Sequence, residues 1–401
     1  MTPIKLLLCC SLTLFTKSSL SQALKYTAQQ ATSIHDSIHK SRWDIGGGLS
    51  HYSFRHMSEF FPVAIIQKSQ KPHLLPLNIK KPLGNIEIEL RTDTVTLEHF
   101  LRNKHVSGFI VVQNGAIIYE QYSGMLPGDQ HTLQSVTKVI TATIITQLAI
   151  EGKLLLTNPI DHYIPELKGT AWQGISIKDI LDMNSGIEGA EINGNAFTNA
   201  EHPYYKFESA LGVLPRTKST PASVYQYITT LKKLRAPGTK PEYHSVNTFI
   251  LGWLAEKLTG SKYTDIISEK IWKPMGAESD AYVCLSDTGV PWFHGGISAT
   301  LRDLARFGML YTSNGIARHK GKIVTMPQID AIYAGQQHAF QWDFAKKGEG
   351  ILKTGFGNQG LYIHPEKNIV IAYFNYVDKD WNIINMLPVV KAVVKAIAPG
   401  K

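Results

Sequence analysis

Cysteine is scarce in this chain, because Cys9, Cys10 and Cys284 are the only three among 401 residues. A disulfide-stapled scaffold needs several pairs, so the composition excludes that class. Compactness must then come from a hydrophobic core, and 43% hydrophobic with 18% charged residues are enough to build one. The values fit an ordinary globular protein of one large or two intermingled domains, and they exclude disordered and fibrous classes.

Long apolar runs are missing as well. The run from Leu6 to Phe15 is shorter than the roughly 20 residues that a membrane-spanning helix needs. Lys5 before this run and the small-residue site Ser21-Gln22-Ala23 after it are typical of a secretory signal peptide, which we predict over residues 1–23. We therefore expect an exported protein, periplasmic or secreted, with no transmembrane segment in the mature chain.

Cleavage of this segment would leave Cys284 as the single cysteine and would preclude an internal disulfide. Lipid attachment at Cys9 or Cys10 is the competing interpretation, although the bulky Leu8 stands where such sites usually carry a small residue. Loss of Lys5 and Lys17 would lower the net charge from +9 to +7. A basic surface of this kind can associate with anionic envelope polymers or membranes. No cluster of Lys and Arg is interleaved with aromatic residues, so we expect no nucleic-acid partner.

Several common enzyme signatures are also absent. The sequence contains neither Gly-x-Ser-x-Gly nor His-Glu-x-x-His, the usual marks of α/β-hydrolases and zinc proteases. The string from Gly355 to Gly360 matches a dinucleotide fingerprint, but strand residues follow it where a helix would be needed. His35 and His39 could share a helix face, yet no third metal ligand accompanies them. We predict neither a metal nor a cofactor.

Hydrophobic patterns indicate the fold. Two β-rich runs, 108–113 and 116–122, flank Asn114-Gly115, the strongest short-range signal for a hairpin. A second hairpin is predicted over residues 360–374, around the turn at 365–368. Helices are predicted at 94–103, 134–152, 248–258, 300–308 and 386–398. Strands near both ends with helices between them predict an α+β protein, with an antiparallel sheet built from N- and C-terminal strands, flanked by helices.

The same reading predicts a division into parts. Residues 24–95 form an arm packed on the main domain, and residues 96–154 and 290–401 form the sheet domain. Residues 155–289 form an inserted, mostly helical domain.

Ser135 and Lys138 are the first candidates for chemistry. On a helix they lie on one face, one turn apart, and the apolar stretch 139–150 behind them predicts a buried helix. Burial lowers the pKa of a lysine, so a neutral amine could take a proton from the serine hydroxyl. The same spacing at Ser37 and Lys40 lies in a polar setting, so the string alone is a weak signal.

Two further motifs accompany this pair. Tyr243-His244-Ser245 leads into an apolar helix, and Lys353-Thr354-Gly355 opens a strand. This ordered set resembles the penicillin-recognising serine hydrolases, which include class C β-lactamases, D-alanyl-D-alanine carboxypeptidases and related esterases. Segments 149–160, 180–186 and 295–308 fit this family too. The resemblance is nearest to the 6-aminohexanoate-dimer hydrolase branch, which also accounts for Arg55-His56-Met57 with Phe61-Pro62 upstream and for Gly357-Asn358-Gln359 downstream, so it extends from about residue 42 to residue 398.

The resemblance implies acyl transfer. Ser135 would attack an amide or ester carbonyl to form an acyl-enzyme, with Lys138 as the base. Tyr243 would pass a proton to the leaving group, helped by ammonium groups that lower its pKa. The backbone N–H groups of Ser135 and Phe356 would form the oxyanion hole. Lys353 would hold a substrate carboxylate.

The resemblance leaves the substrate open. Thr354, Gly355 and Ser245 are expected to bind it, and Ser245 stands where β-lactamases carry Asn, which weakens that assignment. A carboxylesterase, a D-alanyl-D-alanine carboxypeptidase and a β-lactamase remain alternatives, as does an inactive cell-wall-binding relative. Peptidoglycan is a possible partner, and the oligomeric state is undetermined. Four further residues are expected to be structural or to support the catalytic residues, not to be catalytic themselves: His244, Asn247, Cys284 and His294.

Overall fold

The structure is a computed structural model of the chain. It describes residues 26–40, 43–44, 46–91, 93–103, 105–191, 195–380 and 384–398. The predicted signal peptide, with Cys9 and Cys10, lies outside the described residues. Within the described residues, no helix has the length and apolar character to cross a membrane.

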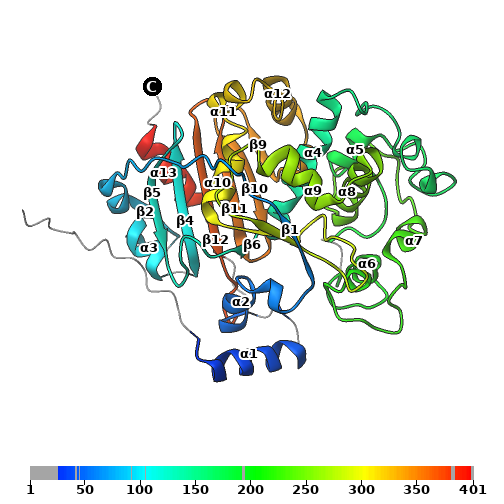
Figure 1. The fold of residues 1–401 in the computed structure, drawn as a ribbon, viewed down its shortest axis with the longest axis horizontal. Coiled ribbons are helices and arrows are strands. Elements are labelled where there is room, and N and C mark those ends of the chain that lie inside the picture. Colours follow the sequence, from blue (N-terminus) through cyan, green and yellow to red (C-terminus); the bar gives the residue numbers. More distant parts are fainter. Residues whose placement is uncertain are drawn as a thin grey trace, which may run out of the picture.

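A six-stranded antiparallel sheet forms the centre of the molecule (Figure 1). Its order is β5-β4-β12-β11-β10-β9, so strands from both ends of the chain meet in one sheet. The strands are β4 (Val106–Gln113), β5 (Ala116–Tyr122), β9 (Phe344–Lys346), β10 (Gly350–Gly355), β11 (Gln359–His364) and β12 (Ile369–Asn375). Both predicted hairpins are confirmed, and Asn114 and Gly115 take the positive φ values, 52° and 82°, that a tight hairpin turn requires.

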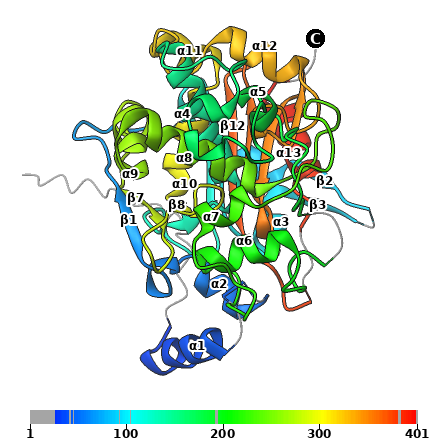
Figure 2. The same cartoon turned by 90° about the vertical axis from the view of Figure 1, so that its right-hand side faces the viewer.

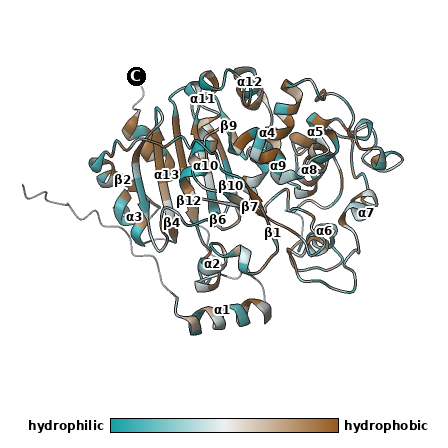
Figure 3. Ribbon diagram, viewed as in Figure 1, coloured by the Kyte–Doolittle hydropathy of each residue, from teal (hydrophilic) through white to brown (hydrophobic). Residues whose placement is uncertain are grey.

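Alternating side chains give this sheet two buried faces, as the brown strands in Figure 3 indicate. Along β4, Phe109 and Val111 pack in a cluster with α3 (Leu97–Asn103) and α13 (Leu387–Ile397). Ile110 and Val112 face the other way, into the main core with α4 (Thr137–Ile150) and α10 (Leu301–Met309). The sheet is therefore enclosed by helices on both sides, as predicted.

Helices dominate the middle of the chain, and Figure 1 shows them gathered beside the sheet. They are α5 (Ile177–Leu181), α6 (Pro203–Leu211), α7 (Val224–Thr229), α8 (Ser245–Thr259) and α9 (Tyr263–Ile267), which continues into a π-helical turn, η6 (Ser268–Trp272). Helices α11 (Ser313–Arg318) and α12 (Met326–Ala334) follow α10. Single 3-10 turns complete the set at η1 (Met57–Glu59), η2 (Lys81–Asn85), η3 (Gln134–Val136), η4 (Ile160–His162), η5 (Pro165–Leu167), η7 (Ala339–Gln341) and η8 (Phe356–Asn358).

Two smaller sheets correct the sequence prediction. A four-stranded sheet of order β1-β7-β8-β6 joins β1 (Val63–Ile66), β7 (Ala281–Cys284), β8 (Ile297–Ala299) and β6 (His131–Thr132). Strand β7 lies in a region predicted as helical, because a four-residue buried run carries no periodicity that separates strand from helix. The helix predicted at 94–103 begins only at Leu97, since Thr94–Thr96 is strand β3, paired with β2 (Glu87–Glu89).

The N-terminal arm packs against both the sheet and the middle helices. Helix α1 (Ala28–Lys40) lies at the outside of the molecule, and α2 (Gly48–Ser53) lies closer to the sheet (Figure 2). Between them, the buried Trp43 donates its indole N–H to the Val213 carbonyl at 3.1 Å. This contact joins the arm to the loop that follows α6. The division into arm, sheet domain and inserted domain remains a prediction.

Candidate active site

Ser135 lies in the 3-10 turn η3, immediately before the central helix α4. Residues 137–148 of α4 are all buried, which agrees with a helix that is apolar on every side. The preceding Gln134 has a φ of 49°, a left-handed conformation that a non-glycine residue rarely adopts. Such strain costs on the order of 1 kcal/mol and is typical of functional turns. The chain thus presents Ser135 at the mouth of a buried helix.

Lys138 lies one turn further along α4, with 1% of its surface exposed. Its Nζ donates to Ser135 Oγ at 3.0 Å and to the His294 carbonyl at 3.0 Å. Burial lowers the pKa of Lys138 to about 8. The nearby Lys353 ammonium also lowers this pKa, whereas the acidic side chains around Lys138 raise it. An amine with this pKa can accept the proton of the hydroxyl it contacts.

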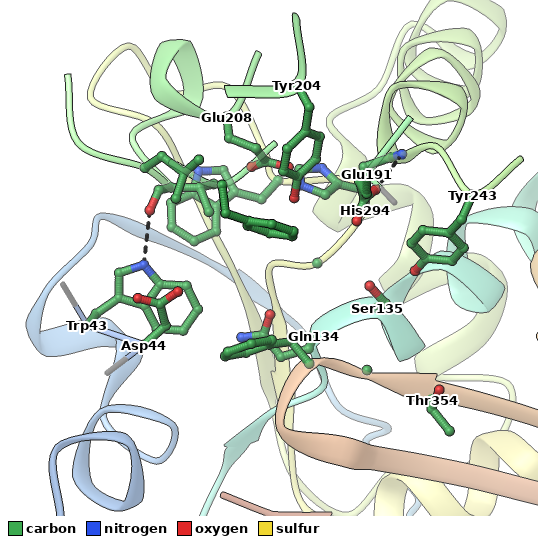
Figure 4. A pocket seen from close by; sticks show the side chains of 18 of the residues that line it. Trp43, Asp44, Gln134, Ser135, Glu191, Tyr204, Glu208, Tyr243, His294 and Thr354 are labelled. Carbon is green, nitrogen blue, oxygen red and sulfur yellow. Dashed lines mark hydrogen bonds and ion pairs between the residues drawn. The ribbon is translucent and has the colours of Figure 1, made fainter. Parts of the chain in front are cut away.

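Tyr243 lies just before α8, and its hydroxyl points toward Ser135 (Figure 4). The Nζ atoms of Lys138 and Lys353 are 5.0 and 4.6 Å from its ring centre, and Lys353 Nζ donates to its hydroxyl at 3.3 Å. The predicted lowering of the Tyr243 pKa is wrong. Burial, followed by the negative charges of Glu191 and Asp343, raises this pKa well above its usual value. The phenol is held neutral.

Lys353 and Thr354 lie on β10, and both are fixed by one carboxylate that the sequence did not indicate. Asp343 Oδ1 is 2.6 Å from Lys353 Nζ, while Asp343 Oδ2 accepts from the backbone N–H and the hydroxyl of Thr354, each at 2.8 Å. Although burial opposes its ionisation, the Lys353 charge and these hydrogen bonds hold the pKa of Asp343 well below its usual range. Asp343 belongs to no recognisable motif, so only its place beside β10 identifies it.

This contact corrects the role expected for Lys353. Its side chain is completely buried and paired with Asp343, and it does not line the cavity beside Ser135. A buried, neutralised ammonium is poorly placed to bind a substrate carboxylate.

Gly355 brings the end of β10 against the nucleophile turn. A Cβ atom at this position would lie 2.7 Å from the Leu133 carbonyl oxygen and 2.9 Å from the Ser135 nitrogen. Only glycine allows this approach. It brings the chain at Phe356 next to Ser135, where both residues line the cavity.

A cavity of about 300 Å³ opens over Ser135. Its walls come from distant parts of the chain, among them those represented in Figure 4 by Trp43, Glu208 and Thr354. Ser245 also lines it, and the Ser245 backbone N–H donates to Glu191 Oε1 at 2.7 Å. Of the residues expected to bind substrate, Ser245, Thr354 and Gly355 therefore reach the cavity.

The walls of this cavity are acidic. Asp44, Glu191 and Glu208 line it together with Asp343, whose charge is paired with Lys353, whereas no lysine or arginine lines it among the residues that the structure describes. His294 also lines it, and its Nε2 is 2.9 Å from Glu208 Oε1. The prediction had given His294 a structural or supporting role, not a catalytic one. No group of His, Cys, Asp and Glu suited to a metal ion occurs within the described residues.

Comparison with known proteins places this site in a family. The model of the Beta-lactamase family matches residues 96–380, and the chain belongs to that family. It is a hydrolase of the serine β-lactamase-like class, as the resemblance of its motifs predicted.

Individual relatives carry more specific names than the family does. The chain is 29% identical to the 6-aminohexanoate-dimer hydrolase of Paenarthrobacter ureafaciens over 340 residues, which cover 80% of this chain and 84% of the relative. A Bacillus anthracis protein named as a candidate 6-aminohexanoate-dimer hydrolase is similar in structure, with a TM-score of 0.77, 25% identity and coverage of 88% and 96% of the two chains. A β-lactamase/D-alanine carboxypeptidase from Yersinia pestis shares the fold, with a TM-score of 0.55, 20% identity and coverage of 75% and 96%. The predicted fold class is confirmed.

Proposed function

We propose that the protein hydrolyses an amide or ester through an acyl-enzyme on Ser135. The 3.0 Å contact between Lys138 Nζ and Ser135 Oγ, with a lysine pKa of about 8, carries this proposal. Neutral Lys138 takes the hydroxyl proton while Ser135 Oγ attacks the carbonyl carbon. The leaving amine or alcohol departs with a proton, and water then attacks the acyl-enzyme and releases the acid.

Tyr243 serves in this scheme as a neutral relay. Its raised pKa keeps the phenolic proton in place, so the hydroxyl donates to the leaving group and is reprotonated from the Lys138 side. The backbone N–H groups of Ser135 and Phe356 stabilise the negative oxygen of the tetrahedral intermediate. The close approach of Gly355 to Ser135 supports this pairing.

The charge of the cavity favours a particular kind of substrate. Acidic walls repel a carboxylate and attract an ammonium group, so the part of the substrate that fills the cavity is neutral or cationic. A linear amide with an amino group at one end and its carboxylate remote from the reacting bond, such as the 6-aminohexanoate dimer named for the relative, meets this condition when its amino end fills the cavity. A short-chain ester meets it too, which makes a carboxylesterase the second candidate. Penicillins and D-alanyl-D-alanine peptides carry a carboxylate near the reacting bond, and Lys353 is not available to hold it.

We also propose that the protein acts outside the cytoplasm, on the strength of the signal-like residues 1–23. Expression of the full sequence, followed by fractionation and mass measurement, tests this. A mature chain that begins near residue 24 in the exported fraction is the expected result, and an uncleaved chain in the cytosol would contradict it.

The nucleophile is tested by intact-protein mass spectrometry after exposure to a fluorophosphonate, a p-nitrophenyl ester, a 6-aminohexanoate dimer and a penicillin. We expect a single adduct on the wild type and none on Ser135→Ala, with hydrolysis reduced about 10³-fold or more. Ser37→Ala is the matched control, because Ser37 has the same spacing to a lysine but its hydroxyl donates to the Ser33 carbonyl within α1. Turnover of the dimer or ester without turnover of the penicillin supports the assignment of substrate class. Binding to peptidoglycan without any adduct or turnover would favour the inactive cell-wall-binding alternative.

A further inference from the structure

The segment between β1 and β2 exposes apolar side chains far from the cavity. Leu74, Leu77 and Ile79 are 68%, 63% and 45% exposed, although Leu75 between them is buried. Folded proteins seldom leave three large apolar side chains open within six residues, and such clusters mark interaction surfaces. Figure 2 shows the segment leaving β1 along one edge of the molecule, beside α9.

This segment is held in place by the body of the protein. The His73 N–H bonds the Gly276 carbonyl at 2.8 Å, and the buried Arg306 donates to the His73 carbonyl at 2.8 Å. Further along, Asn78 and Lys80 donate to the carbonyls of Ile117 and Ile118, each at 2.8 Å, and so cover the free edge of β5. The apolar side chains are therefore presented on a fixed backbone.

The sequence around these side chains is basic. No Asp or Glu occurs from residue 60 to 86, whereas Lys71, Lys80 and Lys81 flank the apolar residues and are exposed. Arg318 at the end of α11 lies against the His73 ring, at 2.5 Å from Nη1 to Nε2. Two more exposed lysines, at positions 320 and 322, follow it. Lys71, Leu74, Leu77, Ile79, Lys80 and Lys81 are called the basic apolar strip below.

We propose that the basic apolar strip docks the protein on the surface of an anionic lipid bilayer. Apolar side chains at the level of the headgroups bury their surface in the acyl boundary, and lysines beside them pair with anionic headgroups. An anionic polymer would use the lysines but would leave Leu74, Leu77 and Ile79 in water. The combination of both kinds of side chain favours the bilayer.

The strip is separate from the proposed catalytic machinery. None of its six residues lines the cavity over Ser135. Changes in the strip should therefore leave hydrolysis in solution unchanged, and this activity reports that each variant is folded.

Sedimentation with vesicles tests the proposal. We expect the wild type to pellet with vesicles of phosphatidylcholine and phosphatidylglycerol in equal amounts, and to remain in solution with phosphatidylcholine alone. The triple change Leu74→Ser, Leu77→Ser and Ile79→Ser should weaken binding at least about tenfold. The triple change Lys71→Gln, Lys80→Gln and Lys81→Gln should weaken it by about fivefold for each lysine removed.

Matched controls come from exposed residues elsewhere. Leu155→Ser and Leu234→Ser remove side chains that are 62% and 61% exposed, and Lys347→Gln, Lys391→Gln and Lys395→Gln remove three exposed lysines. These controls should bind as the wild type does. The proposal is overturned if the wild type stays in solution with both vesicles, if the controls lose as much binding as the strip variants, or if the serine triple variant binds unchanged. In the last case, equal binding to a soluble polyanion would assign the lysines to an anionic polymer instead.

Discussion

Burial affects the two key titrating residues of the site in opposite senses. It lowers the pKa of Lys138 to about 8 and raises that of Tyr243 well above its usual value. In both cases the neutral form is favoured, chiefly because a charge is poorly solvated beside the buried start of α4, and the negative charges of Glu191 and Asp343 add to this effect at Tyr243. The site thus keeps an amine that can accept a proton and a phenol that can donate one, both within reach of Ser135.

The pKa of Lys138 predicts how activity depends on pH. Because the neutral amine is the base, kcat/KM should rise by about tenfold per pH unit below pH 7 and level off above about pH 8. Stopped-flow measurement with an ester that does not itself titrate checks this. A profile that is flat from pH 6 to pH 9 would be inconsistent with Lys138 as the base.

The same lysine should make the protein less stable. The pKa of Lys138 is about 8 when folded and 10.5 when unfolded, so burial of its charge opposes folding fully below pH 8 and not at all above pH 10.5. Lys138→Met should therefore raise the free energy of unfolding at pH 7, on the order of 2 kcal/mol, while it abolishes hydrolysis. Urea unfolding at pH 7 and pH 10 measures the gain, which should shrink at the higher pH. Lys395→Met, at an exposed lysine, is the control and should change neither the free energy of unfolding nor the rate of hydrolysis.

At the scale of elements, one carboxylate fixes β10 relative to the nucleophile. Asp343 follows η7, where His338, Phe340 and Gln341 all have positive φ values. It binds Lys353 and Thr354 and so sets the strand whose end, Gly355, meets the turn at Ser135. The Lys-Thr-Gly motif acts here as part of the scaffold that shapes the cavity.

Removing one partner of the Asp343–Lys353 ion pair should destabilise the protein. Asp343→Asn leaves the fully buried Lys353 charge without a counterion, so we expect a loss of about 3–5 kcal/mol in the free energy of unfolding. Replacing both partners, Asp343→Leu with Lys353→Met, removes both charges and should lose less than the single change. Denaturant titration of the two variants compares them. A single variant as stable as the wild type would show that Asp343 does not neutralise Lys353.

At the scale of the whole molecule, the cavity exists only where distant segments of the chain meet. The arm supplies Trp43 and Asp44, α6 and the loop after it supply Glu208 and Val213, and the end of β10 supplies Thr354. The indole of Trp43 packs near Phe54, with ring centres 5.9 Å apart, and bonds the Val213 carbonyl. The arm therefore closes one side of the site.

Removing the wall that Trp43 forms should affect both stability and substrate binding. Trp43→Ala should cost about 3–5 kcal/mol and raise KM more than it lowers kcat, because it opens the wall without touching Ser135. Trp43→Phe keeps most of the packing and loses one hydrogen bond, so about 1 kcal/mol is expected. Thermal unfolding and steady-state kinetics measure the two effects. An unchanged KM in Trp43→Ala would mean that substrate does not reach this side of the cavity.

The sequence by itself determined much of the architecture and the centre of the site. Asn114-Gly115 between two β-rich runs specified a hairpin, and the uniformly apolar stretch behind Ser135 specified a buried helix, because both signals are local in the sequence. The spacing of Ser135 and Lys138 placed the two side chains on one helical turn, and the structure puts them in contact.

Only the tertiary structure decided what depends on contacts between distant residues. Asp343, Glu208 and Trp43 carry no motif, and they reach the site through packing of segments more than a hundred residues apart. The sign of the Tyr243 pKa shift depends on burial, which outweighs the neighbouring ammonium groups and which no spacing reveals. Whether Lys353 can bind a substrate carboxylate likewise depends on its ion pair with Asp343. The propensity of a segment for helix, strand or turn depends on neighbouring residues, whereas burial and charge pairing depend on the assembled fold.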